Sequence, residues 1–385
     1  MKIVVADDLP ASAVALLRAE PGWQVDARSG RSPEALAADL ADADALLVRS
    51  ATKVDARLLA AAPRLRIVAR AGTGVDNVDV AAATERGIVV VNAPGANSIS
   101  VAEHAFALML ALARSVPAAD RAMKAERWEK RRFLGSELRG KTLGVAGLGR
   151  IGQEVAQRAK AFGMRVVAHD PFIAAEVASG LGVDLLSLDE MCATSDYVTL
   201  HLPSTPETRH LFDDERFSRC KRGLRLINTA RGDLIDPDAL HRAIDAQIVA
   251  SAALDVFESE PPKDWALAKL PQVIATPHIA ASTEEAQELV GLETAAAVRD
   301  FLREGVVRNA VNFPSLAPEV FQRLQPWIRL VDRLGAIVSQ MGPRGLRPSA
   351  SAITARWPRA PRPTCSRAAW RPACCVRFFP AACRS

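Results

Sequence analysis

Short apolar runs alternate with amphipathic stretches along the first 95 residues. The strand-like runs occupy residues 2–7, 44–49, 65–70 and 88–92, and helical patterns rich in Ala and Leu lie around 11–19, 33–41 and 55–62. Strands that alternate with helices in this way are typical of parallel sheets covered by helices. The first part of the chain is therefore predicted to be an α/β unit.

A long helical pattern at residues 97–127 separates this series from a second one. We expect a capping box at its start, in which Ser100 and Glu103 bond each other's backbone N–H groups. Strands are then predicted at 142–147, 164–169, 197–202, 224–228, 249–255 and 272–276, and a helix at 283–304. Continuous apolar runs such as 143–146 indicate strands buried on both faces. The pattern as a whole predicts a doubly wound α/β fold.

The composition changes after Met341. The last 44 residues contain nine Arg, seven of the 24 Pro and four of the six Cys, but no Asp or Glu. We favour a shifted reading frame here over a genuine disordered basic tail, and the cysteine spacings match no zinc site. Since the whole chain carries +5, residues 1–341 carry −4. The overall basicity therefore does not indicate a nucleic-acid partner.

The cysteines, the length of the apolar runs and the first residues together predict the cellular location. Cys192 and Cys220 are isolated, which fits a reducing compartment. No apolar run reaches the roughly 18 residues of a membrane span, and the acidic start at residues 1–8 is typical of a strand rather than a signal peptide. We expect a cytoplasmic protein with no membrane partner and no metal.

A glycine-rich turn, Gly147-Leu148-Gly149-Arg150-Ile151-Gly152, follows a predicted strand and opens a predicted helix. Gly147 permits the tight turn, Gly149 lets a pyrophosphate approach the backbone, and Gly152 lets helix and strand pack closely. The helix N-terminus then binds the phosphates.

Asp170 ends the next predicted strand. Its carboxylate can accept from a ribose 2′-hydroxyl and would repel a 2′-phosphate. A glycine turn without a ligand is the alternative, but the context favours binding of NAD rather than NADP.

Three polar residues follow predicted strands of the second series, where a doubly wound sheet places its ligand. Hydride transfer to a 2-oxo acid needs a carboxylate clamp, a proton donor and a group that adjusts the donor's pKa. Arg231 offers a fork that suits a carboxylate. His278 titrates near neutral pH, and Glu260 is a carboxylate that can raise its pKa.

Simpler interpretations remain open for these residues. Arg231 and Glu260 can belong to a surface ion pair, and a histidine after a strand is usually a loop residue. We adopt the loop interpretation for His201 and His210, and we interpret His104 as a helix-packing residue.

At these residues the chain resembles the D-isomer-specific 2-hydroxyacid dehydrogenases, from about residue 2 to 340, and within them the branch that oxidises 3-phosphoglycerate in L-serine synthesis. The matching stretches are Val48–Val54, Gly72–Asn77, Gly140–Gly152, Asn228–Gly232, Ala253–Pro262 and Pro277-His278. The resemblance implies a Rossmann-like NAD domain at 96–282 and a discontinuous, flavodoxin-like substrate domain at 1–95 and 283–312. The start of an intervening domain would follow at 313–341, and the aberrant tail at 342–385.

The resemblance also implies roles. His278 would be the acid–base, Glu260 its carboxylate partner and Arg231 the substrate clamp. The implied cofactor contacts are Thr73, Arg150, Ile151, Asp170, Thr229, Ala230, Asp255 on the nicotinamide side, and Ala281. The family usually has Gly two residues after the His, and Ala280 stands there instead, so its methyl group can crowd the nicotinamide. Longer members carry a serine-binding regulatory domain, which the aberrant tail puts in question.

A phosphorylated substrate requires additional cations. Arg49 and Arg70, at predicted strand ends, are the candidates, with Gly72, Thr73 and Gly74 offering backbone N–H groups. Lys130–Arg132 could come from a partner subunit of a homodimer or homotetramer, or could be a solvated helix end.

Other functions remain open. One is a dehydrogenase for glycerate, lactate or 2-hydroxyglutarate, and another, of a different class, is an NAD-sensing corepressor-like binding protein. A third is that the altered tail leaves an inactive product.

Overall fold

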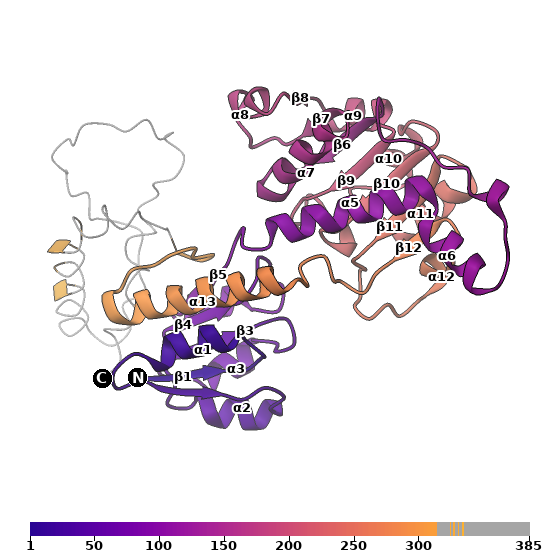
Figure 1. Cartoon of the computed structure of the whole chain (residues 1–385). Helices are drawn as coiled ribbons and strands as arrows, with labels where there is room; N and C mark the ends of the chain where they lie inside the picture. Colours follow the sequence, from indigo (N-terminus) through magenta and orange to yellow (C-terminus); the bar gives the residue numbers. More distant parts are fainter. Residues whose placement is uncertain (314–323, 325, 328–329, 331–332, 335–385) are drawn as a thin grey trace. The chain divides into compact units, whose positions relative to one another are not determined.

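The computed structural model describes residues 1–313 together with 324, 326, 327, 330, 333 and 334. The described residues divide into two compact units, one formed by Met1–Pro94 with the described residues from Glu288 onward and the other by Gly95–Gln287 (Figure 1). Apart from Phe313 and the six isolated residues, the expected intervening segment at 313–341 lies outside the described residues. The expected tail at 342–385, and with it the frameshift, lies entirely outside them.

Unit 1, residues 1–94 and 288 onward, contains a five-stranded parallel sheet in the order β2-β1-β3-β4-β5. This is the flavodoxin-like strand order. Two separate apolar clusters, one around Leu46 and the other around Leu47, show that the sheet is covered on both faces. The strands are β1 (Lys2–Val5), β2 (Gln24–Ala27), β3 (Ala45–Val48), β4 (Ile67–Arg70) and β5 (Val89–Asn92), and the helices are α1 (Ala11–Arg18), α2 (Pro33–Leu40), α3 (Ala56–Ala60), α4 (Val80–Glu85) and α13 (Glu284–Glu304).

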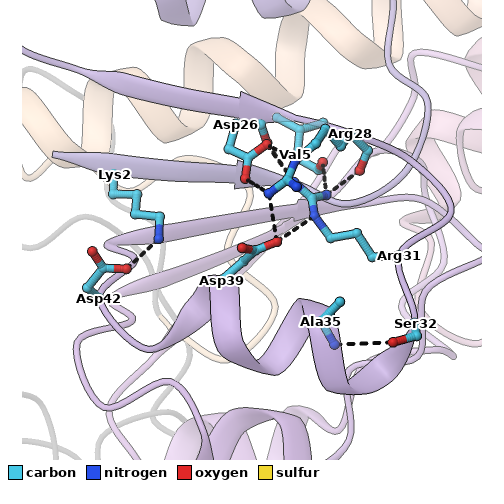
Figure 2. Close-up of polar contacts among 9 residues, drawn as sticks. All are labelled: Lys2, Val5, Asp26, Arg28, Arg31, Ser32, Ala35, Asp39 and Asp42. Atoms are coloured by element: carbon cyan, nitrogen blue, oxygen red, sulfur yellow. Dashed lines mark hydrogen bonds and ion pairs between the residues drawn. The ribbon is translucent and has the colours of Figure 1, made fainter.

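Strand β2 was not predicted, because it is a polar edge strand held by ion pairs. The Arg31 side chain contacts Asp26, Asp39 and the Val5 carbonyl (Figure 2). This side chain is 5% exposed, and its guanidinium lies 2.8 Å from both carboxylates and donates to the Val5 carbonyl at 2.9 Å. Arg28 lies 2.9 Å from Asp39 as well. The hydrogen bond from Arg28, opposed by burial and helped by Arg31, lowers the pKa of Asp26 to about 2. These contacts fix β2 beside β1 although its own sequence gives little indication of a strand.

Unit 2, residues 95–287, contains a seven-stranded parallel sheet in the order β12-β11-β10-β9-β6-β7-β8. Its first strand lies between β7 and β9, as in a Rossmann sheet. The predicted doubly wound α/β fold is therefore confirmed. The strands are β6 (Thr142–Ala146), β7 (Arg165–His169), β8 (Asp184–Leu185), β9 (Tyr197–Leu200), β10 (Leu224–Asn228), β11 (Val249–Leu254) and β12 (Val273–Ala275). The helices are α5 (Ser98–Arg114), α6 (Val116–Lys124), η1 (Lys130–Phe133), α7 (Arg150–Ala161), α8 (Ala175–Gly180), α9 (Leu188–Thr194), α10 (Asp214–Ser218), η2 (Gly232–Leu234), α11 (Pro237–Asp245) and α12 (Ala266–Lys269).

The long helix predicted at 97–127 is two helices, so that prediction was wrong in detail. Ser115 adopts a left-handed conformation with φ of 51° between α5 and α6. Pro117 has no N–H to continue the helix, and the Ala113 carbonyl accepts from Ser136 N instead, at 2.9 Å. The predicted capping box is also wrong, because α5 already begins at Ser98. The Ser100 hydroxyl bonds Thr283 Oγ1 at 2.7 Å.

The second boundary between the units falls inside α13, five residues beyond the expected end of the NAD domain. The start of this helix is fixed to unit 2, because Thr283 Oγ1 accepts from Ala286 N at 3.2 Å and Gln287 donates to the Ala281 carbonyl at 2.8 Å. The rest of α13 contributes Ala295, Val298 and other residues to the core of unit 1. The roles expected for the two domains remain predictions.

The described residues contain neither a helix that could span a membrane by itself nor a cluster of metal-binding side chains. In that part of the chain, no single helix is long and apolar enough to cross a membrane, and the only pair that passes by length and composition, α5 with α6, is bent by 64°. Within the same residues, no group of three or more His, Cys, Asp or Glu side chains is arranged to hold a metal ion.

Candidate active site

The glycine-rich turn joins β6 to α7 in unit 2. Gly147 has φ of 93°, and a Cβ there would lie 2.7 Å from the carbonyl oxygen of His201. A Cβ on Gly152 would overlap the carbonyl of Gly147. A Cβ on Gly149, by contrast, would have nothing within 4 Å. Two of the glycines are thus needed for packing, while the third leaves open space at the start of α7, where a pyrophosphate fits.

Asp170 follows β7 and binds the glycine-rich turn directly. Its carboxylate accepts from Leu148 N at 2.8 Å and from Phe172 N at 2.9 Å. These bonds hold the carboxylate beside the turn, at the carboxyl end of the sheet, where a doubly wound fold binds a nucleotide. This position of the Asp170 carboxylate is consistent with the predicted contact to a ribose, which stays a prediction.

The turn after β10 carries Arg231 and is closed by the buried side chain of Asn228. Asn228 Nδ2 donates to the Arg231 carbonyl at 2.8 Å, and its Oδ1 accepts from Ala230 N at 3.0 Å. Gly232 lies directly against the backbone of Phe257 and Glu258. The buried hydroxyl of Thr229 has no hydrogen-bond partner within the described residues, so it is available to a ligand.

Glu260 and His278 form a pair at the carboxyl end of the same sheet. His278 Nδ1 lies 2.6 Å from Glu260 Oε2, and the side chains are 50% and 39% exposed. The hydrogen bond that His278 makes to Glu260 raises the pKa of His278, against the effects of burial and of Arg231. Burial alone would raise the pKa of Glu260, but the bonds from His278 lower it. The geometry keeps the carboxylate ionised and favours a protonated imidazole.

Asp255 lies under this pair. It is fully buried, and its carboxylate accepts from Ile279 N and Ala280 N, both at 2.9 Å. Its main-chain carbonyl accepts from His278 N at 2.8 Å. Ala280, which replaces the usual Gly, is itself buried, and Ala281 follows it. Asp255 therefore determines the path of the loop that carries His278.

The candidate substrate cations lie in unit 1. Val48 pairs with Arg70 across β3 and β4, so Arg49 and Arg70 leave neighbouring strand ends. Arg49 N donates to Asp7 at 2.6 Å, and Arg49 Nη1 donates to the Asp8 carbonyl at 3.2 Å. The Arg70 guanidinium covers Gly72 on the side where a Cβ would stand. The Thr73 carbonyl accepts from Asn92 at 2.6 Å, and the adjacent Gly74 completes this loop.

The structure thus brings the predicted residues together in two groups. Unit 2 gathers the glycine-rich turn with Arg150 and Ile151 at the start of α7, Asp170, the Thr229–Arg231 turn, and the Asp255, Glu260, His278 and Ala281 group. Unit 1 gathers the cations. Lys130–Arg132 lie in η1, where Arg132 bonds Glu129 at 3.0 Å. Sequence reasoning missed Thr276. His104, interpreted there as a helix-packing residue, lies 3.4 Å from Asp255 and 3.2 Å from Thr276.

Comparison with known proteins points to one group of enzymes. Residues 106–280 match the NAD-binding domain of the D-isomer specific 2-hydroxyacid dehydrogenases. The chain is 49% identical over 340 residues to D-3-phosphoglycerate dehydrogenase of Archaeoglobus fulgidus, covering 88% of this chain and 64% of that protein. It is 51% identical over 346 residues to D-3-phosphoglycerate dehydrogenase 2, chloroplastic, of Arabidopsis thaliana, covering 89% and 55%.

A solved structure of the same group of enzymes is similar to this chain over its full length. The D-lactate dehydrogenase of Aquifex aeolicus, complexed with NAD and lactic acid, is 31% identical, with a TM-score of 0.70 over 82% of this chain and 100% of that one. The chain spans somewhat less than two thirds of the length of the two curated relatives named above.

Proposed function

Since the chain belongs to the D-isomer-specific 2-hydroxyacid dehydrogenases, we propose that it oxidises 3-phospho-D-glycerate to 3-phosphohydroxypyruvate with NAD, the first step of L-serine synthesis. The observation that carries the proposal is the 2.6 Å pair of His278 and Glu260. It lies in the unit that holds the glycine-rich turn. The similarity to D-3-phosphoglycerate dehydrogenases supports this choice of substrate.

NAD is the cofactor of this family's binding domain, and the described residues fit it. The open space at Gly149 and the start of α7 suit the pyrophosphate. The Asp170 carboxylate suits the ribose, and Thr229 has a buried hydroxyl to offer. The chemistry that bound NAD would supply is a hydride acceptor for the oxidation at C2 of the substrate.

His278 moves the proton of the reaction. A carboxylate only accepts hydrogen bonds, so Nδ1 of His278 donates to Glu260. Nε2 is then left to take the proton of the substrate hydroxyl during oxidation and to return it during reduction. Glu260 stabilises the imidazolium that forms, as the raised pKa of His278 indicates. The Arg231 fork binds the substrate carboxylate in two parallel bonds.

Arg49 and Arg70 are our candidates for binding the substrate phosphate. A phosphate monoester carries up to two negative charges at neutral pH, and guanidinium groups bind it bidentately. The main chain of Arg49 is held by Asp7, and its guanidinium makes one exposed hydrogen bond, from Nη1 to the Asp8 carbonyl at 3.2 Å, which a phosphate would replace. Arg49→Ala should raise the KM for 3-phosphohydroxypyruvate far more than the KM for an unphosphorylated 2-oxo acid.

The deciding experiment measures NADH oxidation with 3-phosphohydroxypyruvate, and with pyruvate, glyoxylate and 2-oxoglutarate at equal concentrations. We expect the highest kcat/KM with 3-phosphohydroxypyruvate. His278→Ala should lower kcat about 10²-fold or more while NADH still binds. A preference for an unphosphorylated acid would refute the substrate, and NADH binding without reduction of any 2-oxo acid would favour a cofactor-sensing protein.

We also propose that the chain forms a homo-oligomer through the segment that follows α6. Trp128 is 79% exposed there, Leu134 is exposed as well, and so is Met123 in the last turn of α6. Large exposed apolar side chains within one short segment are typical of interfaces. Sedimentation should show a dimer or tetramer that Trp128→Asp weakens, and a monomeric wild-type chain would refute the proposal.

A further inference from the structure

Three polar side chains from distant parts of unit 2 form a chain beneath the His278 loop. His104 lies on α5, Thr276 follows β12, and Asp255 follows β11. His104 Nε2 lies 3.2 Å from Thr276 Oγ1, and Thr276 Oγ1 donates to Asp255 Oδ1 at 2.5 Å. Nε2 is also 3.4 Å from Asp255 Oδ1.

The hydrogens of this chain can be assigned by counting donors. A carboxylate has none, so the single proton of Thr276 goes to Asp255. Thr276 Oγ1 can then only accept from His104, which must carry its hydrogen on Nε2. Burial alone would raise the pKa of Asp255, but the bonds from His104, Thr276, Ile279 and Ala280 lower it. Asp255 is therefore an ionised carboxylate held by donors on every side.

The His278 loop depends on that carboxylate for its shape. Asp255 accepts from the two amides that follow His278, and its own carbonyl accepts from His278 N. His278 itself has φ of 54°, a left-handed conformation that residues with a side chain rarely adopt. Such a conformation persists only where surrounding bonds fix it, and the bonds to Asp255 do so here.

We propose that His104 is a positioning residue, which acts through Thr276 and Asp255 to hold the His278 loop in its reactive conformation. The inference rests on the proposed function only in taking His278 as the acid–base. His104 does not touch the reacting atoms. His104 lies on α5, which packs against β10 and β11. Through His104 the position of the His278 loop is therefore fixed relative to the sheet.

The test compares His104→Gln with His104→Leu. Gln can place an amide N–H near the position of Nε2, whereas Leu keeps apolar volume and has no donor. We expect Gln to keep kcat near the wild-type value and Leu to lower it about tenfold with little change in substrate KM, since orientation rather than binding is lost. Thr276→Val interrupts the same series of hydrogen bonds and should likewise lower kcat with little change in substrate KM, whereas the control Thr276→Ser should keep kcat near the wild-type value.

Amide hydrogen exchange at Ile279 and Ala280 provides a second measurement that needs no substrate. We expect faster exchange in His104→Leu and Thr276→Val and wild-type protection in His104→Gln and Thr276→Ser. If Leu kept both kcat and protection, or Gln lost as much as Leu, His104 would be a packing residue and the proposal would be overturned. If the wild-type chain reduced no 2-oxo acid, the proposed function would fail, and the exchange measurement would still decide whether His104 holds the loop.

Discussion

Replacing Gly232 by Ala should separate two segments of the candidate active site. A Cβ at this position would come within 2.5 Å of three backbone atoms of Phe257 and Glu258. Nonbonded carbon contacts are about 3.5–4.0 Å, so the two backbones must move apart by about 1 Å or more. One of them carries Arg231, and the other leads to Glu260. A misplacement of about 1 Å can lower a rate about 10²-fold, or about 2.7 kcal/mol in the barrier.

The assay is kcat/KM for NADH-dependent reduction of 3-phosphohydroxypyruvate, with the melting temperature measured on the same samples. Overpacking of this kind also destabilises a fold by about 1–3 kcal/mol, so the activity must be compared at a temperature where Gly232→Ala is folded. Gly180→Ala is the matched control, because its Cβ would have nothing within 4 Å, and it should leave kcat/KM unchanged. A folded Gly232→Ala variant with wild-type kcat/KM would refute the argument that these segments form one rigid unit.

Three further outcomes are expected. Asp170→Ser should narrow the preference for NADH over NADPH, and equal efficiency with both cofactors in the wild-type chain would contradict the role of Asp170. Because the pKa of His278 is raised, the rate of reduction should be high at low pH and decline as the pH rises through that raised pKa. Glu260→Gln removes the largest cause of the raised pKa, so the rate of this variant should begin to decline at a lower pH. An unchanged pH–rate profile in Glu260→Gln would argue against the role of the His278–Glu260 pair. Arg31→Ala should lower the free energy of unfolding by about 1.5–3 kcal/mol, because it removes charged bonds from a buried guanidinium. Arg28→Ala should lower it much less, because the Arg28 side chain is exposed and its ion pairs are screened by solvent. Similar urea midpoints for the two variants would count against the burial argument.

The fold class could be predicted because central strands such as β3 and β6 contain continuous apolar runs, at residues 45–48 and 143–146, that only a sheet covered on both faces can bury. Two of the four edge strands, β2 and β8, could not be predicted, whereas the edge strands β5 and β12 were. β8 has two residues, and β2 depends on ion pairs with residues 28–39 that no local pattern reveals. Edge strands of this kind are defined by tertiary contacts rather than by periodicity.

The candidate site shows the same division. Arg231, Glu260 and His278 could be selected from their positions after strands, because parallel strands end at one edge of the sheet. His104 could not, since it meets Thr276 across 172 residues of sequence and stands on a helix that otherwise looks like ordinary packing. A side chain that acts through two others leaves no local signal in the sequence.

The interruption of unit 1 has a consequence for synthesis of the chain. Its core needs Val298 and Leu302 from α13 beside Ile3 and Val5 from the first strand, and Val90 N bonds Asn312 across 222 residues. The residues of unit 2, by contrast, form one uninterrupted stretch.

Domains usually fold in the order in which the ribosome makes them. Here the first strands to emerge must wait while Gly95–Gln287 is translated, which takes about 10–40 s at roughly 5–20 residues per second. During that interval one apolar face of the sheet β1–β5 is covered by α1 alone of the two helices that share its core, because α13 has not been made. The middle of the polypeptide can therefore reach its native structure before the beginning does, and the N-terminal segment is the one most exposed to aggregation during translation.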